Sequence, residues 1–292
     1  MSRTRYALPT AALLLALLPS GPGTAGDLAA FEQVRDSQRR PVAQARTASN
    51  DQDWCRDAER NYDRDREVFC EVRELRESGA SRLEALDIAN GSVSVTGSSR
   101  RDITVQARVV ATAESDSEAR SLARDVSVTL DNGRLRSNGP ESERRRSWSV
   151  SYRVEVPSSF DVNLETSNGS VAVEGVKGRI DMESSNGSVR LTDVGGRVNA
   201  RTSNGSVQVT LSGKYFDGEG MTVVTSNGSA RLDVPNDFNA HLIAGTNNGS
   251  MTLDIPVSVQ GRISKRIDTN LGSGGATIEM RTSNGSLRIG RR

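Results

Sequence analysis

Apolar and polar residues alternate strictly on both sides of a short motif that recurs through the second half of the chain. The motif is Thr-Ser-Asn-Gly-Ser-Val at residues 166–171, and residues 202–207 repeat it without change. Residues two, four and six positions before each Asn are apolar or carry a hydroxyl group, and residues three and five positions after it are apolar. Alternation with a period of two on both sides of a turn predicts a strand, a turn and a second strand in every copy.

Six copies of the motif share the phase of this alternation, and their Asn residues follow one another at steps of 18, 18, 23, 21 and 36 positions. Steps of this size are typical of solenoid repeats. We therefore expect an all-β fold, a parallel β-solenoid (β-helix) in which each copy of about 18–23 residues is one coil and the inward columns merge into one core. The expected corner residues are Asn168, Gly169, Asn186, Gly187, Asn204, Gly205, Asn227, Gly228, Asn248, Gly249, Asn284 and Gly285.

The Asn-Gly pair predicts left-handed backbone angles at each corner, because Asn tolerates them and Gly adopts them freely. Stacked Asn side chains can also form a ladder of hydrogen bonds along the coils. The alternative is a meander of β-hairpins with Asn-Gly turns, in which the residues after each Asn pair antiparallel with those before it.

The first 82 residues are expected to lie outside the repeat domain of residues 83–292. Residues 1–26 are predicted to be a signal peptide, because Arg3 and Arg5 precede the apolar run 7–18 and small residues follow it. No second apolar run of membrane length occurs, so no transmembrane segment is expected after cleavage. Residues 27–82 are predicted to be a polar linker and then a charged segment, either helical or an irregular cap.

Two cysteines, Cys55 and Cys70, lie in this charged segment, and the chain has no others. An even number of cysteines in an exported protein predicts a structural disulfide. A zinc site is disfavoured, because the sequence contains a single histidine, His241, and no Cys-x-x-Cys motif.

The regions around the repeats are less regular. Ser115 to Glu118 fits a helix capping box and predicts one short helix. Asp131-Asn132-Gly133 predicts a hairpin turn, residues 139–146 a loop, and Val150 to Val156 a strand that stops at Pro157. Residues 260–275 are expected to form a loop, or a degenerate coil with its corner at Asn270.

Little in the sequence points to chemistry. The net charge is +1 and aromatic residues make up 4% of the chain, so neither nucleic-acid binding nor a stripe of aromatic sugar-binding residues is expected. Glu165, Asp181 and Glu183 could approach one another on neighbouring coils, but chance alone gives one such acidic cluster on a charged surface, so a catalytic or calcium role there is disfavoured. We expect no catalytic, cofactor or metal site, and we expect His241 to face solvent without an acid partner.

Val156-Pro157, followed by Val162-x-Leu164-x-Thr166-Ser167-Asn168-Gly169-Ser170-Val171 and its repeats, resembles the bacterial DUF4097 putative-adhesin family. It is also similar to the auto-transporter-adhesin head (GIN) domains. The likeness covers roughly residues 85–292. It implies a parallel β-solenoid outside the cytoplasmic membrane and brings no catalytic residues. The segment with Cys55 and Cys70 departs from the family.

These observations predict an exported, non-enzymatic protein with a structural or adhesin-like role at the bacterial cell envelope. It would be periplasmic, cell-surface or secreted, with an envelope polysaccharide or a surface protein as partner. The alternatives are a carbohydrate-active enzyme on a β-helix and an accessory protein of an envelope-stress system.

Overall fold

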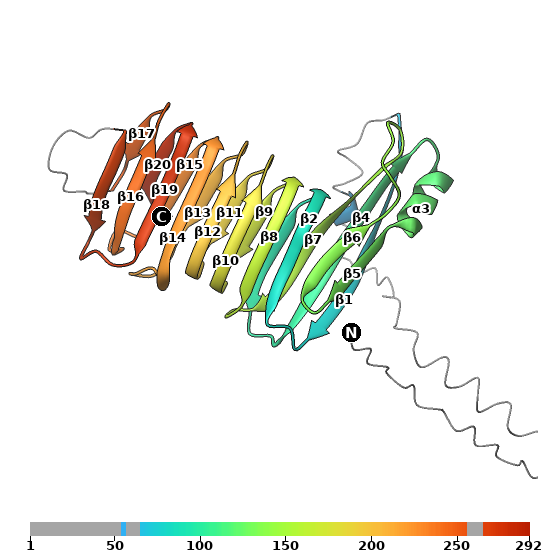
Figure 1. Ribbon diagram of the computed structural model, residues 1–292, viewed down its shortest axis with the longest axis horizontal. Helices are drawn as coiled ribbons and strands as arrows, with labels where there is room; N and C mark the ends of the chain where they lie inside the picture. Colours follow the sequence, from blue (N-terminus) through green and yellow to red (C-terminus); the bar gives the residue numbers. More distant parts are fainter. Residues whose placement is uncertain (1–53, 57–64, 256–264) are drawn as a thin grey trace, which may run out of the picture. The chain divides into compact units, whose positions relative to one another are not determined.

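A computed structural model of the protein describes residues 54–56, 65–255 and 265–292, all within the unit Ala43–Arg292. The predicted signal peptide and the linker of residues 27–50 lie outside the described residues. The elements (Figure 1) are β1 (Glu67–Ser78), β2 (Arg82–Asn90), β3 (Val93–Ser98), β4 (Asp102–Ala113), α3 (Asp116–Asp125), β5 (Ser127–Asp131), β6 (Arg134–Asn138), β7 (Ser147–Pro157), β8 (Asp161–Asn168), β9 (Val171–Glu174), β10 (Lys177–Ser184), β11 (Val189–Thr192), β12 (Gly195–Thr202), β13 (Val207–Thr210), β14 (Gly218–Asn227), β15 (Ala230–Val234), β16 (Ala240–Thr246), β17 (Met251–Leu253), β18 (Arg266–Leu271), β19 (Thr277–Asn284) and β20 (Leu287–Arg291).

The described strands form two sheets, and the all-β prediction is confirmed. Sheet A has the order β1-β4-β7-β3-β9-β11-β13-β15-β20-β17, and sheet B has the order β18-β16-β19-β14-β12-β10-β8-β2-β6-β5. The strands of the repeats pair in parallel. Antiparallel pairs occur near the ends of the sheets, where β1 pairs with β4, β4 with β7, β5 with β6, and β16 with β18. Both sheets are therefore mixed.

The two strands of one repeat lie in different sheets, so they do not form a hairpin. In the second copy β10 belongs to sheet B and β11 to sheet A. Val189 at the start of β11 pairs in parallel with Val171 of β9 on one side and Val207 of β13 on the other. The hairpin alternative is therefore wrong for these copies, because it requires antiparallel pairing across the corner.

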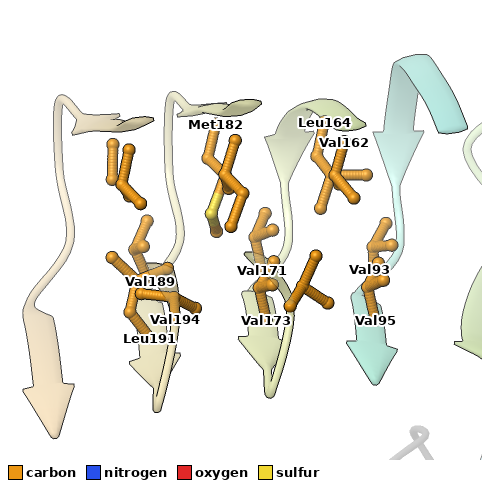
Figure 2. Close-up of a cluster of buried hydrophobic side chains, with 14 of the residues drawn as sticks. Val93, Val95, Val162, Leu164, Val171, Val173, Met182, Val189, Leu191 and Val194 are labelled. Atoms are coloured by element: carbon orange, nitrogen blue, oxygen red, sulfur yellow. The ribbon is translucent and has the colours of Figure 1, made fainter. Parts of the chain in front are cut away.

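Like positions of the repeats form the core between the sheets. Leu191 on β11 is fully buried, and its partners Val173 and Val209 on the neighbouring strands are equally inaccessible. Figure 2 shows the inward side chains of successive repeats, including Val171, Val189 and Met182, in adjoining columns. Most outward residues between them are polar, such as Arg190 and Gln208, as the period of two predicts.

The repeats are not stacked in the order in which the chain makes them. The last two repeat strands, β19 and β20, lie between β14 and β16 in sheet B and between β15 and β17 in sheet A (Figure 1). We call one repeat-region strand of sheet B together with the strand of sheet A that follows it a coil. The first coil in the chain, β2 and β3, pairs with β8 and β9, although residues 99–160 separate them. The copies share one register at the corner motif, and their order along the chain does not determine which copies are neighbours.

Residues 266–271 were expected in a loop or a degenerate coil, and this prediction is wrong. They form β18, which pairs antiparallel with β16 at the edge of sheet B. Asn270 lies inside this strand, opposite His241, and not at a corner. Ile267 and Leu271 are buried while Arg266 and Asp268 are exposed, so the segment alternates like a strand but lacks the corner motif. Residues 260–264 of the expected loop lie outside the described residues.

Residues 67–78 form β1, and the prediction of a helical segment or an irregular cap for this stretch is wrong. β1 pairs with β4 along its whole length and widens sheet A beyond the expected boundary at residue 83. Because charged residues occur on both faces of β1, the sequence does not show the alternation of apolar and polar residues that is typical of a strand. Arg73 lies opposite the buried Ala107, pairs with Glu71, and donates to the carbonyl oxygens of Ala123, at 2.7 Å, and Val126 at the end of α3.

The other local predictions for the first half are confirmed. Ser115 is the N-cap of α3, and its hydroxyl accepts a hydrogen bond from the backbone N–H of Glu118. Asn132 and Gly133 have φ of 50° and 74° and connect β5 to β6 in a hairpin. Such left-handed angles at both central residues suit the twist of a two-residue hairpin turn. β7 ends at Pro157.

Tyr152 of β7 makes the stability of the fold sensitive to alkaline pH. Its side chain is 2% exposed, and burial raises the pKa of its phenol to about 12, although an interaction with Ser137 opposes the rise. In the unfolded chain the pKa is about 10. The stabilisation is therefore complete below pH 10 and is lost as the pH rises towards 12. Denaturant titrations of wild type and Tyr152→Phe at pH 8 and pH 11 should show a larger alkaline loss in the wild type, whereas Tyr215→Phe, at an exposed site, should behave like the wild type.

Candidate functional site

The repeated corner is the most ordered polar array in the described part of the chain, and an asparagine ladder runs along it. The side-chain amide of each Asn donates to the amide oxygen of the Asn in the neighbouring coil, over distances of 2.8–3.3 Å. In spatial order the ladder contains Asn90, Asn168, Asn186, Asn204, Asn227, Asn284 and Asn248. These side chains hydrogen-bond to one another, so the motif contributes first to the cohesion of the stack.

A second ladder, of hydroxyl groups, runs parallel to the first on the inner side of the corner. Thr202 lies two residues before its Asn, is buried, and donates at 2.9 Å to the carbonyl oxygen of Gly187 in the neighbouring coil. The same bond recurs at 2.7–3.3 Å for Thr166, Ser184, Thr225, Thr282 and Thr246. The sequence analysis counted these residues only as inward positions. Their restriction to Ser and Thr, among otherwise aliphatic inward columns, was the signal that was overlooked.

The corner glycines are required by close stacking, and the prediction of left-handed backbone angles there is wrong. None of the expected corner residues has a positive φ. A Cβ on Gly187 would instead lie 1.8 Å from the carbonyl oxygen of Gly169, and a Cβ on Gly205 would lie 1.9 Å from that of Gly187. The remaining corner glycines meet the neighbouring glycine carbonyl oxygen at 1.8–2.1 Å in the same way. Each glycine therefore makes room for the backbone of the next coil.

The hydroxyl ladder can be tested by replacing Thr202 with valine, which keeps the shape and the preference for a strand but removes the donor to Gly187. We expect the free energy of unfolding to fall by about 1 kcal/mol, the usual net contribution of one hydrogen bond. The midpoint of urea denaturation measures this loss. Thr252→Val, at an exposed site on β17, is the control and should stay within about 0.5 kcal/mol of the wild type. Equal effects of the two substitutions would contradict a role for the ladder.

A disulfide attaches the segment before β1 to sheet A. Cys55 and Cys70 are bonded, with their Cα atoms 5.7 Å apart. Two guanidinium groups contact the Trp54 ring, with the Cζ of Arg108 4.9 Å and that of Arg153 3.9 Å from the ring centroid. Arg108 also donates to the Trp54 carbonyl oxygen at 2.8 Å. Cation–π contacts and one covalent bond thus hold residues 54–56 against β4 and β7.

Mass spectrometry of the protein purified without reductant should detect a peptide in which Cys55 is linked to Cys70. Because the bond closes a loop of sequence separation 15, its loss should lower the free energy of unfolding by up to about 3 kcal/mol. The double variant Cys55→Ser/Cys70→Ser should therefore melt at a lower temperature than the wild type. Its hydrophobic core and its Asn ladder should stay unchanged. Two free thiols in the protein purified without reductant would contradict this prediction.

The acidic residues singled out in the sequence do come together on the outer face of sheet B. Glu165 and Glu183 are paired in register on β8 and β10, and both line a hollow of about 330 Å³ together with Asp181. Burial tends to raise the pKa of Asp181, but hydrogen bonds from Arg179 and Asn199 outweigh it, and the pKa is lowered. Asp181 is therefore ionised at neutral pH, which does not suit a general acid.

Metal ligation is not indicated at this cluster. Within the described ranges no group of three His, Cys, Asp or Glu side chains has the arrangement needed to hold a metal ion. The two carboxylate oxygens of Asp181 already accept hydrogen bonds from Arg179, at 2.8 Å, and from Asn199, at 2.9 Å.

His241 does have an acid partner, contrary to the sequence analysis. It lies on β16 opposite β18, with Nε2 3.2 Å from a carboxylate oxygen of Asp268 and Nδ1 2.9 Å from the amide oxygen of Asn270. The sequence did not reveal this contact, because the antiparallel pairing of β18 was not predicted. Both ring nitrogens contact β18, so the side chain helps to hold this edge strand.

A second hollow, of about 720 Å³, opens on the outer face of sheet B near β18. Lys265, Arg266 and Arg281 are the charged residues of its lining, and Val224 and Ile243 contribute apolar surface. It differs from the first hollow in the sign of its charge.

Of the helices in the part of the chain described by the structure, none has the length and apolar character needed to cross a membrane.

Comparison with known proteins gives a family match and several similar solved structures. The sequence profile of the Toastrack DUF4097 family matches residues 80–290. A solved "putative cell adhesion protein" from Clostridium sporogenes is similar at 10% identity and a TM-score of 0.44, covering 77% of this chain and 100% of that one. A "putative adhesin" from Bacteroides fragilis is similar at 12% identity and a TM-score of 0.37, covering 76% of this chain and 97% of that one. No curated protein matches the chain.

Proposed function

Because this chain belongs to the Toastrack DUF4097 family, we propose that residues 83–292 form a β-solenoid that acts as a rigid, non-enzymatic display scaffold at the bacterial cell envelope. In this proposal residues 1–26 are a signal peptide for export. Before this domain, β1 pairs with β4 at the edge of sheet A, and the Cys55–Cys70 disulfide attaches residues 54–56 to β1. The scaffold has an adhesin-like role: it presents its outer faces to an envelope polysaccharide or a surface protein.

The observation that carries the proposal is the pair of ladders at the corner. The motif repeats polar residues in every copy, and both the Asn amides and the Ser or Thr hydroxyls bond to the next coil. Residues that recur in this way support order along the stack. The outward side chains, by contrast, differ from coil to coil. Parallel strands about 4.8 Å apart arrange them in rows with one side chain per coil. Outward side chains that vary, held on a regular stack of strands, are suited to the recognition of a partner.

The outer faces favour a polar partner. Leu86 and Tyr215 are the large apolar side chains that are exposed in the described part of the chain, and a contiguous apolar docking patch would need more. Charged residues occupy many outward positions, such as Glu183, Arg201 and Arg231. A hydrated polymer or a charged protein surface fits these faces better than an apolar partner does.

The test is a binding and activity assay on the purified protein. A pull-down from solubilised cell envelopes and a glycan array should both yield saturable binding, and fractionation of the producing cells should place the protein outside the cytoplasm. The same preparation should show no turnover of polysaccharides, esters or peptides above a blank. Turnover that disappears in Glu183→Gln would favour the carbohydrate-active enzyme instead, with Arg190→Gln as the variant expected to leave any activity unchanged.

A further inference from the structure

One glycine on the outer face of sheet B is not explained by its own surroundings. Gly245 of β16 does not have a positive φ. A Cβ there would lie 3.4 Å from the Lys265 carbonyl oxygen and 3.7 Å from the Arg266 Cβ, which is ordinary van der Waals contact. The corner glycines, by contrast, leave no room for a Cβ. Glycine weakens the interior of a strand and often marks a place where a ligand comes close.

Gly245 creates a notch between two arginines. The register places Arg266 of β18 on one side of it and Arg281 of β19 on the other, and Val224 of β14 lies beyond Arg281 in the same row. Strands in a sheet are about 4.8 Å apart, so both guanidinium groups can reach over the glycine. The notch lies within the hollow of about 720 Å³, a volume typical of small-ligand sites.

The lining of this hollow is cationic. Among the described residues, Lys265, Arg266 and Arg281 line it and no carboxylate does. Asp268 and Glu279 flank Ile243 in the register but are not part of the lining. Lys265 donates to the Asn247 carbonyl oxygen at 2.7 Å, and Arg281 pairs with the neighbouring Glu279. Arg266 also has a partner of its own. A guanidinium group has five N–H donors, so each arginine can bind a further carboxylate while it keeps its partner. The planar fork of Arg matches the two oxygens of a carboxylate.

The rest of the hollow decides which carboxylate fits. Ile243, half-buried and two residues before Gly245 on the same face, and Val224 give it apolar surface. β16 is paired on both sides, by β18 and β19, so its backbone offers no main-chain hydrogen bonds to a peptide. A sugar ring needs none, since its C–H face packs on apolar side chains and its hydroxyl groups meet polar ones such as Ser283 and Asn247 at the rim.

We propose that this notch binds an acidic sugar unit of a polysaccharide. The sugar carboxylate lies over Gly245 between the guanidinium groups of Arg266 and Arg281, and the ring of that unit rests against Ile243. The inference rests on the proposed display function in one respect, because it takes the physiological ligand to be an envelope polymer. It adds the class of ligand and the place on the scaffold where recognition occurs.

Titration calorimetry with tetragalacturonate tests the site. Gly245→Leu fills the notch without changing charge, and Arg281→Gln removes one guanidinium group. Each should weaken binding roughly 10-fold to 100-fold, as expected for the loss of a charge-assisted contact. Arg190→Gln, an exposed arginine on sheet A, is the matched control and should bind like the wild type. The same oligosaccharide with its carboxylates reduced to alcohols should bind at least 10-fold more weakly.

Three results would overturn the site: wild-type affinity in Arg281→Gln, equal binding of the reduced oligosaccharide, or equal binding of hexaglutamate, which would indicate an acidic peptide. Arg266→Gln and Arg281→Gln carry the test if Gly245→Leu does not fold. Envelope binding that is unchanged in all three variants would keep the display function and reject this site. Tetragalacturonate binding that the variants abolish, with no envelope binding by the wild type, would keep the site and reject the display function.

Discussion

Replacing Gly187 with alanine is expected to destabilise the protein by roughly 3 kcal/mol or more, although alanine adds a single methyl group. The new Cβ would lie 1.8 Å from the carbonyl oxygen of Gly169 and 2.9 Å from the Ser184 hydroxyl. Relief requires the backbones of two coils to separate, which weakens the Asn and hydroxyl ladders on either side. The midpoint of denaturation in urea, followed by far-UV circular dichroism, measures the loss.

Two variants distinguish this explanation from one based on backbone angles. Gly187→Asn should be at least as destabilising as Gly187→Ala, because any side chain meets the Gly169 carbonyl, whereas a left-handed corner would tolerate Asn. Gly245→Ala is the control, since its Cβ has room, and it should leave stability unchanged or raise it slightly. A tolerated Gly187→Asn would show that the coils do not approach as closely as the structure indicates.

Replacing Leu191 with alanine is expected to lower the free energy of unfolding by about 2–5 kcal/mol. Leu191 is fully buried between Val173 of β9 and Val209 of β13. Truncation leaves a cavity in a column that the strands on either side hold open, so the site cannot collapse easily. Chemical denaturation with the disulfide intact is the measurement.

The control for Leu191 is its neighbour in the same strand. Arg190 faces outward and is exposed, and Arg190→Ala should change the free energy of unfolding by less than about 0.5 kcal/mol. Similar losses at the two positions would mean that the inward and outward faces of β11 are assigned wrongly.

Several elements could be predicted because their signals are local. The strands of the repeats follow from the period of two, α3 follows from the capping box at Ser115, and the β5–β6 hairpin follows from Asn132-Gly133. The shared phase of the copies also predicted which residues lie opposite one another, such as Val189 and Val171. Each of these depends on residues close in sequence, or on copies that are interchangeable.

The candidate site was less predictable, because it depends on which strands are neighbours. The sequence correctly predicted that Glu165 and Glu183 lie close together, because their copies are consecutive in the chain. It did not predict the contact of His241 with Asp268, or the row in which Gly245 lies between Arg266 and Arg281. Those contacts require β18 as an antiparallel edge strand and β19 beside β16, and no local pattern encodes either.

The sequence by itself determined the all-β fold, the inward and outward faces of each repeat strand, and the family. Side-chain alternation along a strand is a local property, and six copies in one phase repeat it. Only the tertiary structure decided the order of the coils, the strand character of residues 67–78 and the role of the corner glycines. Stacking order depends on contacts between segments far apart in the chain. The Gly187 residue illustrates the difference: its own φ would accept a side chain, and only the carbonyl of the neighbouring coil excludes one.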